Sequence, residues 1–204
     1  MIKTTTQNSH YWRQRQIDWN QAYFTPEHPH RQFFVELLRK MRWGSLVELG
    51  CAAGANLHVI QQAFPRADLG GVDVSAAAIA EAKKHANNKV LFDVAPAHKV
   101  FLQTKSIDVV ITDMMLIYQG PLMIKKTLNE IKRLARREVI LCEFHHPNFF
   151  MRQGLRLKGY NAYNYEKLLA SMDFYDISTY KISAAMWPGG EPQKTFGYFI
   201  RASL

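Results

Sequence analysis

The feature that most limits what this chain can fold into is a short apolar run that breaks at a turn of small residues. Residues 45–49 read Ser-Leu-Val-Glu-Leu, residues 50–54 read Gly-Cys-Ala-Ala-Gly, and apolar residues then recur at helical spacing from Leu57. This pattern predicts a strand, a tight turn and a helix, which is how an α/β sheet builds a nucleotide site. Small residues let the backbone approach a ligand closely, and the helix N-terminus offers unpaired N–H groups.

Two nucleotide-binding patterns can be compared with this turn. The dinucleotide pattern G-x-G-x-x-G requires glycine at positions 50, 52 and 55. This chain has Gly50, Ala52 and Ala55 there, so only the first position matches. The pattern E/D-x-G-x-G-x-G is matched by Glu48, Gly50 and Gly54, with Ala52 in place of its middle glycine. An acidic residue at the end of the strand suits a cationic ligand and would repel a pyrophosphate. The second pattern therefore fits better.

Through this second pattern the chain resembles the class I S-adenosylmethionine-dependent methyltransferases, in which it is motif I. The resemblance spans about residues 45–204 and implies an α/β fold of three αβα layers with a Rossmann-like sheet. That sheet would have seven mostly parallel strands in the order 3-2-1-4-5-7-6, with an antiparallel last strand. S-Adenosylmethionine is the implied cofactor. The motif I residues expected to bind it are Glu48, Gly50, Cys51, Ala52, Gly54 and Asn56.

Two further acids follow predicted strands. Residues 68–75 predict a strand that ends at Asp73, and this acid lies 19 residues after Gly54, where a nucleotide-binding unit holds both ribose hydroxyls. Both nucleotide patterns predict such an acid, so it indicates a nucleoside without choosing between them. For residues 89–94, the third predicted strand, the resemblance implies that Asp93 binds the adenine amino group, with Val74 and Val94 beside the ring. A solvated turn acid is the alternative for Asp93.

Residues 106–113 predict a fully buried fourth strand that carries Asp113 to the ligand-binding edge of the sheet. The resemblance implies that Asp113, Met114 and Met115 line the cofactor and that Tyr118 faces the acceptor. The Asn/Asp-Pro-Pro-aromatic element of nucleobase amino methyltransferases does not occur after this strand, which argues against that substrate. Residues 116–121 read Leu-Ile-Tyr-Gln-Gly-Pro, similar to small single-domain methyltransferases of uncertain substrate.

The fifth predicted strand, residues 139–147, ends in two histidines. His145 and His146 are candidate catalytic residues, together with Tyr118, because a histidine can take a proton from an acceptor hydroxyl or amine near neutral pH. Glu143 and His145 would share one face of the strand, but no third ligand follows at zinc-like spacing. We therefore expect no metal site.

Residues 1–44 predict a helical cap or lid in front of the cofactor-binding domain, residues 45–204. Apolar spacing predicts one helix from His30 to Arg42, and the aromatic residues before it either pack on the sheet edge or cover the ligand. The candidate lid and substrate residues are Tyr11, Arg13, Arg15, Tyr23 and Trp187.

The last part of the chain predicts two strands with no helix between them, residues 175–182 and 195–201, which would pair antiparallel. Residues 147–160 are basic and contain glycine, and they predict an irregular loop that covers the substrate. Residues 163–172 predict a short helix.

Composition limits the remaining possibilities. No apolar run reaches the length of a membrane span, and the two cysteines fall in predicted buried elements, so a reducing cytoplasm is the expected setting. The formal net charge of +9 permits a nucleic-acid partner, although much of the excess falls on one predicted helix that needs a polar outer face anyway. The sequence specifies no oligomeric state.

These observations predict a methyltransferase that moves a methyl group to an oxygen or nitrogen atom of a small molecule by direct displacement. Three alternatives stay open: methylation of RNA or protein through the basic surface, an NAD-dependent oxidoreductase, and a non-catalytic partner subunit with the same fold.

Overall fold

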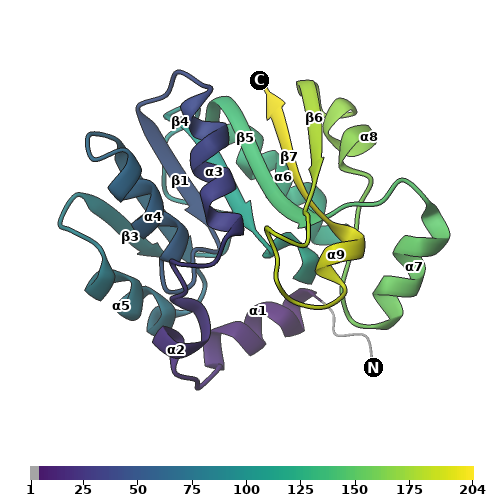
Figure 1. Ribbon diagram of the computed structural model, residues 1–204, viewed down its shortest axis with the longest axis horizontal. Coiled ribbons are helices and arrows are strands. Elements are labelled where there is room, and N and C mark those ends of the chain that lie inside the picture. Colours follow the sequence, from purple (N-terminus) through teal and green to yellow (C-terminus); the bar gives the residue numbers. More distant parts are fainter. Residues whose placement is uncertain (1–4) are drawn as a thin grey trace.

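Seven strands form one sheet in the order β3-β2-β1-β4-β5-β7-β6 in the computed structural model, which describes residues 5–204 (Figure 1). Neighbouring strands pair parallel from β3 to β5, whereas β7 runs antiparallel to both β5 and β6. The predicted strand order and the antiparallel last strand are confirmed. The strands are β1 Ser45–Leu49, β2 Asp68–Asp73, β3 Val90–Val94, β4 Ile107–Asp113, β5 Ala135–Phe144, β6 Tyr175–Lys181 and β7 Gly197–Ser203.

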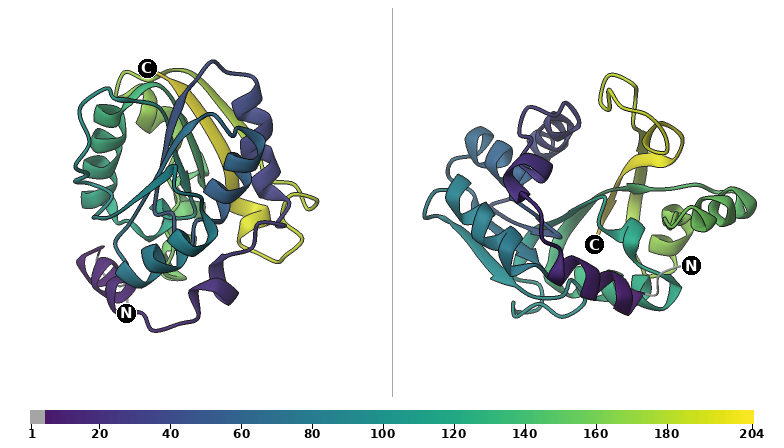
Figure 2. Two further views of the ribbon diagram at one scale, coloured as in Figure 1. Left: turned by 90° about the vertical axis from the view of Figure 1, so that its left-hand side faces the viewer. Right: turned by 90° about the horizontal axis from the view of Figure 1, so that it is seen from below.

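Helices cover both faces of this sheet, which confirms the three-layer architecture (Figure 2). Helices α3, α4 and α5 pack on one face, and α6 and α8 pack on the other. The helices are α1 Thr5–Gln14, α2 Trp19–Tyr23, α3 His30–Arg39, α4 Ala55–Ala63, α5 Ala76–His85, α6 Pro121–Leu134, α7 Phe149–Leu157, α8 Tyr165–Ala170 and α9 Gln193–Phe196, with a short 3-10 helix η1 at Leu116–Tyr118.

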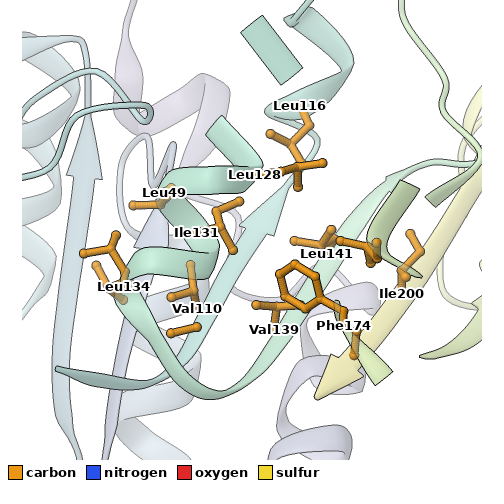
Figure 3. Close-up of a cluster of buried hydrophobic side chains, with 14 of the residues drawn as sticks. Leu49, Val110, Leu116, Leu128, Ile131, Leu134, Val139, Leu141, Phe174 and Ile200 are labelled. Carbon is orange, nitrogen blue, oxygen red and sulfur yellow. The ribbon is translucent and has the colours of Figure 1, made fainter. Parts of the chain in front are cut away.

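The core forms because each helix buries one apolar stripe. In α6, Leu128, Ile131 and Leu134 recur at helical spacing and are fully buried. They pack in one cluster with Val110 of β4 and Val139 of β5 (Figure 3). The opposite face of the sheet is covered in the same way by α3 and α4, which contribute Phe34, Leu37, Leu38, Leu57 and Ile60.

The predicted cap segment divides into two parts in the structure. Helix α3 packs in the same core as β1 and α4, and it ends at Arg39, earlier than predicted. Helices α1 and α2 lie apart from that layer, below the sheet in Figure 1. Within the segment expected to form a cap, α1 and α2 therefore lie beyond the edge of the sheet, whereas α3 is part of the core.

Two predictions about the C-terminal part are wrong in detail. Residues 149–157 form helix α7 where we expected an irregular loop, because the Asn148 side chain caps the helix by accepting from the backbone N–H of Met151. Apolar residues do recur at helical spacing in this segment, although only Leu155 is buried, and its basic residues and Gly154 favoured the loop interpretation. The last two strands do pair antiparallel, but α9 lies between them. Within the part of the chain described, no helix is long and apolar enough to span a membrane.

Candidate functional site

A cavity of about 360 Å³ opens at the carboxyl ends of β1, β2 and β4. Its volume lies in the range of small-molecule sites in proteins. One side is formed by the turn after β1 and by the ends of β2 and β4, and the other by aromatic residues of α1, α2 and η1. The cavity is therefore at the edge of the sheet where α/β folds bind ligands.

The turn after β1 depends on two glycines in the left-handed region of backbone conformation. Gly50 has φ +77° and Gly54 has φ +79°, and Gly54 caps the N-terminus of α4. A Cβ atom on Gly50 would lie 2.4 Å from Cγ of Met115. Glycine is required here both for the backbone angle and for the close approach of the loop after β4. Ala52 also adopts positive φ, at +46°, in place of the expected middle glycine.

Asp73 joins the end of β2 to this turn. Its Oδ2 accepts from the backbone N–H of Ala52 at 3.0 Å, and its Oδ1 accepts from the N–H of Ser75 at 2.8 Å. Burial raises the pKa of Asp73, while these backbone N–H groups act in the opposite direction. Each carboxylate oxygen keeps a second acceptor position, so the side chain can still bind a diol that enters the cavity.

A buried polar cluster forms the floor of the cavity. The amide of Asn56 donates to Oε1 of Glu48 at 2.6 Å and to Oδ2 of Asp113 at 3.0 Å. Its carbonyl accepts from the guanidinium of Arg31 at 2.6 Å. The other two carboxylate oxygens, Oε2 of Glu48 and Oδ1 of Asp113, are buried without a hydrogen-bond partner among the residues described. Buried polar atoms without a partner are costly to keep, which is typical of a functional site and not of a packed core.

The two acids of this cluster differ in charge. Burial raises the pKa of Glu48 to about 8, so this side chain is protonated near neutral pH. Burial alone would also raise the pKa of Asp113, but the His30 ring and the Arg31 guanidinium outweigh it and hold that pKa well below its usual range. The cluster thus contains one neutral and one charged carboxyl group.

The opposite wall is aromatic. Trp12 packs edge-on against Tyr118 with ring centroids 5.2 Å apart, and Trp19 lies 5.2 Å from Tyr23. All four side chains line the cavity, as does Tyr160. Trp12 and Trp19 were not among the predicted site residues, because nothing in a run of aromatic residues separates those that pack from those that face a ligand.

The predicted lid residues divide between the cavity and the surface. Tyr23 and Trp187 line the cavity. Tyr11, Arg13 and Arg15 do not line it; the Arg15 guanidinium lies over the rings of Tyr11 and Trp12, at 5.3 and 4.8 Å from their centroids. Arg15 therefore covers the outer side of the aromatic wall.

The two histidines expected to act as bases lie outside the site. His145 is buried, its Nδ1 accepts from the backbone N–H of Tyr165, and it does not line the cavity. His146 accepts from the backbone N–H of Asn148 and lies outside the cavity as well. The backbone beyond β5 bonds to Phe196 and Tyr163, so packing of these segments covers the end of the strand.

Glu143, the acid of the rejected metal pair, has a structural contact instead. Its carboxylate accepts from the backbone N–H groups of Met115, Leu116 and Ile117. This holds the loop that presents Met114, Met115 and Tyr118 to the cavity. No cluster of three or more metal-binding side chains occurs in the described part of the chain.

The adenine contact predicted for the third strand is not found at the cavity. Asp93 and Val94 are exposed, Oδ1 of Asp93 accepts from the N–H of Val94, and neither residue lines the cavity. Because β3 is the edge strand, the chain reaches the cavity only with the segment 95–98 that follows it. Val74, the other predicted neighbour of the ring, does line the cavity, as do Glu48, Gly50, Cys51, Ala52, Asn56, Asp73, Asp113, Met114 and Met115.

Comparison with known proteins gives one family match and many structural ones. The family model described as "Methyltransferase domain" matches residues 44–159. Magnesium protoporphyrin IX methyltransferase from Synechocystis, solved with bound S-adenosylhomocysteine, is similar with a TM-score of 0.70 and 18% identity over 98% of both chains. A geranyl diphosphate C-methyltransferase from Streptomyces coelicolor gives a TM-score of 0.68 and 15% identity over 98% of this chain and 97% of that one.

A candidate O-methyltransferase from Nostoc punctiforme is also similar, with a TM-score of 0.67 and 18% identity over 85% of this chain, which spans 55% of that protein's length. A search among curated protein sequences gave no match. At these identities, the structural likenesses show the fold.

Proposed function

The chain belongs to the methyltransferase domain family, and on that premise we propose that it is an S-adenosylmethionine-dependent methyltransferase with a small-molecule acceptor. The observation that carries this proposal is the cavity, which is lined by Asp73 at the end of β2 and by the charged Asp113 at the end of β4, opposite a wall of aromatic side chains. The acceptor atom is an oxygen or a nitrogen.

The residues of the cavity fit S-adenosylmethionine. Asp73 offers two acceptor oxygens to the ribose hydroxyls, and Gly50 of the turn after β1 also lines the cavity. The charged carboxylate of Asp113 suits the ammonium group at the amino-acid end of the cofactor. When bound, the cofactor supplies an electrophilic methyl group on its sulfonium. The task of the protein is then mainly to position the acceptor and to exclude water.

The charge distribution favours a small acceptor over a polyanion. Among the residues that line the cavity, Arg31 is the one Lys or Arg side chain, and it donates to Thr25 and Asn56. The basic residues around α6 are largely paired: Arg133 with Glu130, and Arg136 and Arg137 with Asp108. Methylation of RNA or protein is the second candidate, supported by the net charge of +9. It requires activity that falls steeply with salt.

Two aspartates at the ends of adjacent strands provide a matched test of the cofactor site. In Asp73→Ala, we expect S-adenosylhomocysteine to bind more weakly by about 1–3 kcal/mol, because the ribose hydroxyls lose their acceptors. Asp93→Ala removes an equivalent carboxylate that lies outside the cavity, and we expect its affinity to equal that of the original protein. Isothermal titration calorimetry measures both, and thermal unfolding of each variant checks that it is folded.

The reverse pattern would contradict the proposal. If Asp93→Ala weakened binding and a folded Asp73→Ala did not, the adenosine would lie over β3 and the ribose assignment would be wrong.

A further inference from the structure

We propose that His28 is the general base of the reaction, oriented by His30 and Asp113, and that the acceptor atom is the oxygen of an acidic hydroxyl such as a phenol. This inference rests on the proposed function and adds the proton acceptor and the substrate class. The sequence analysis placed the base at the end of β5, whereas this group comes from the other end of the chain.

Three side chains from separate elements form a continuous hydrogen-bonded row. His28 lies in the loop between α2 and α3 and lines the cavity, and His30 is the first residue of α3 and only 2% exposed. Nδ1 of His30 is hydrogen-bonded to Nδ1 of His28, and Nε2 of His30 lies 2.8 Å from Oδ2 of Asp113. The row therefore runs from a buried carboxylate at the end of β4 to the cavity.

The carboxylate fixes where each proton sits along this row. A charged Asp113 only accepts hydrogen bonds, so Nε2 of His30 must carry a proton. In a neutral His30 ring, Nδ1 is then an acceptor, so the proton in the bond between the two rings belongs to Nδ1 of His28. In a neutral His28 ring, Nε2 is left as a lone pair. No residue in the described part of the chain forms a hydrogen bond with that nitrogen.

The surroundings keep His28 neutral and in place. The Trp187 ring packs against both imidazoles, with centroid distances of 4.6 Å to each. Burial lowers the pKa of His28 most, Arg31 and a protonated His30 act in the same direction, and Asp113 and Glu27 act in the opposite direction. These are the charged and titratable groups around the ring, and their net effect favours an unprotonated base at neutral pH.

The proton balance of the reaction needs such a base when the acceptor is a hydroxyl. As the acceptor oxygen forms its bond to the methyl carbon, its proton moves to Nε2 of His28. The electron pair of the broken carbon–sulfur bond leaves with the sulfur. The positive charge on His28 is then stabilised by Asp113 through the His30 ring, the arrangement by which a buried carboxylate supports a histidine base. Asp113 and His30 are positioning residues in this scheme.

Nuclear magnetic resonance of the ¹⁵N-histidine-labelled full chain tests the row without any ligand. Long-range ¹H–¹⁵N spectra distinguish the two neutral tautomers of each ring, and His28→Gln and His30→Gln variants assign the signals. We expect His28 to carry its proton on Nδ1 and His30 on Nε2. In His30→Gln, the Nδ1–H preference of His28 should be lost, whereas His146→Gln should leave it unchanged. A His28 ring protonated on Nε2 in the original protein would overturn the proposal.

A phenol probe tests the chemistry at the same nitrogen. With S-adenosylhomocysteine at saturation, we expect 4-nitrophenol to bind as its phenolate near neutral pH, visible as a change in its absorption spectrum. His28→Gln should lower the ratio of bound phenolate to bound phenol by about tenfold, the effect of one pKa unit. Failure of the probe to bind, or binding as the neutral phenol in the original protein, would contradict the proposal.

The two proposals can fail separately. His28→Gln should bind S-adenosylhomocysteine within about twofold of the original protein, because His28 acts on the acceptor. If the original protein does not bind that nucleoside, the proposed function is wrong. If it binds while His28 shows the other tautomer, only the inference about the base is wrong.

Discussion

At the scale of single residues, the site is defined by two buried carboxyl groups in different charge states. Glu48 and Asp113 share the amide of Asn56, yet only Asp113 has cationic or protonated neighbours at hydrogen-bond distance, His30 and Arg31. Asp113 is therefore charged, while burial raises the pKa of Glu48 to about 8. Motif I identified Glu48 as a residue of the cofactor site, but the protonation state of this side chain depends on residues that are distant in sequence.

This difference predicts how stability changes with pH. Glu48 titrates near its ordinary pKa of 4.5 in the unfolded chain and near 8 in the folded protein. Between these values the folded protein holds a proton that the unfolded chain has lost, so the contribution of Glu48 to stability falls as pH rises through this window. Glu48→Gln removes the titration. We expect the free energy of unfolding of the variant, minus that of the original, to increase from pH 5 to pH 9. Urea unfolding at several pH values measures it, and a difference independent of pH would contradict the assignment.

At the scale of elements, the cavity exists because two loops approach closely. The turn between β1 and α4 meets the loop after β4 at Gly50 and Met115. Glu143 on β5 holds that loop through three backbone N–H groups. The positions of these strands thus determine the shape of the cofactor side of the cavity.

Two glycine substitutions test this contact against a matched control. Gly50→Ala places a Cβ atom against Met115 and requires alanine at positive φ, so we expect it to destabilise the protein by about 1–3 kcal/mol and to weaken nucleoside binding. Gly154 lies in α7 with nothing within 4 Å of an added Cβ atom. Gly154→Ala should raise stability by about 0.5–1 kcal/mol through helix propensity. Denaturant unfolding measures both, and a Gly50→Ala variant as stable as the original protein would show that the contact does not matter.

At the scale of the whole molecule, the sequence predicted the parts of the fold that depend on local periodicity. The turn at Gly50 and the position of Asp73 follow from short patterns, and both residues are found at the cavity, whereas the strand order, which is confirmed, was implied by the resemblance to the methyltransferases. Helix α7 was missed because its basic residues and Gly154 favoured a loop, although its apolar residues do recur at helical spacing. The row from His28 to Asp113 was also missed. The two histidines are 83 or more positions away from Asp113 in the sequence, and no local pattern joins them.

The central claim is that the whole cavity is built for a cationic sulfur nucleoside and not for a dinucleotide. The end of β4 brings the charged carboxylate of Asp113 to the lining of the cavity, and this charge would repel a diphosphate. Isothermal titration calorimetry of the full chain with S-adenosylhomocysteine and with NAD tests this claim most directly. The structure predicts saturable binding of S-adenosylhomocysteine at one site per chain and no binding of NAD. Binding of NAD without binding of S-adenosylhomocysteine would contradict it.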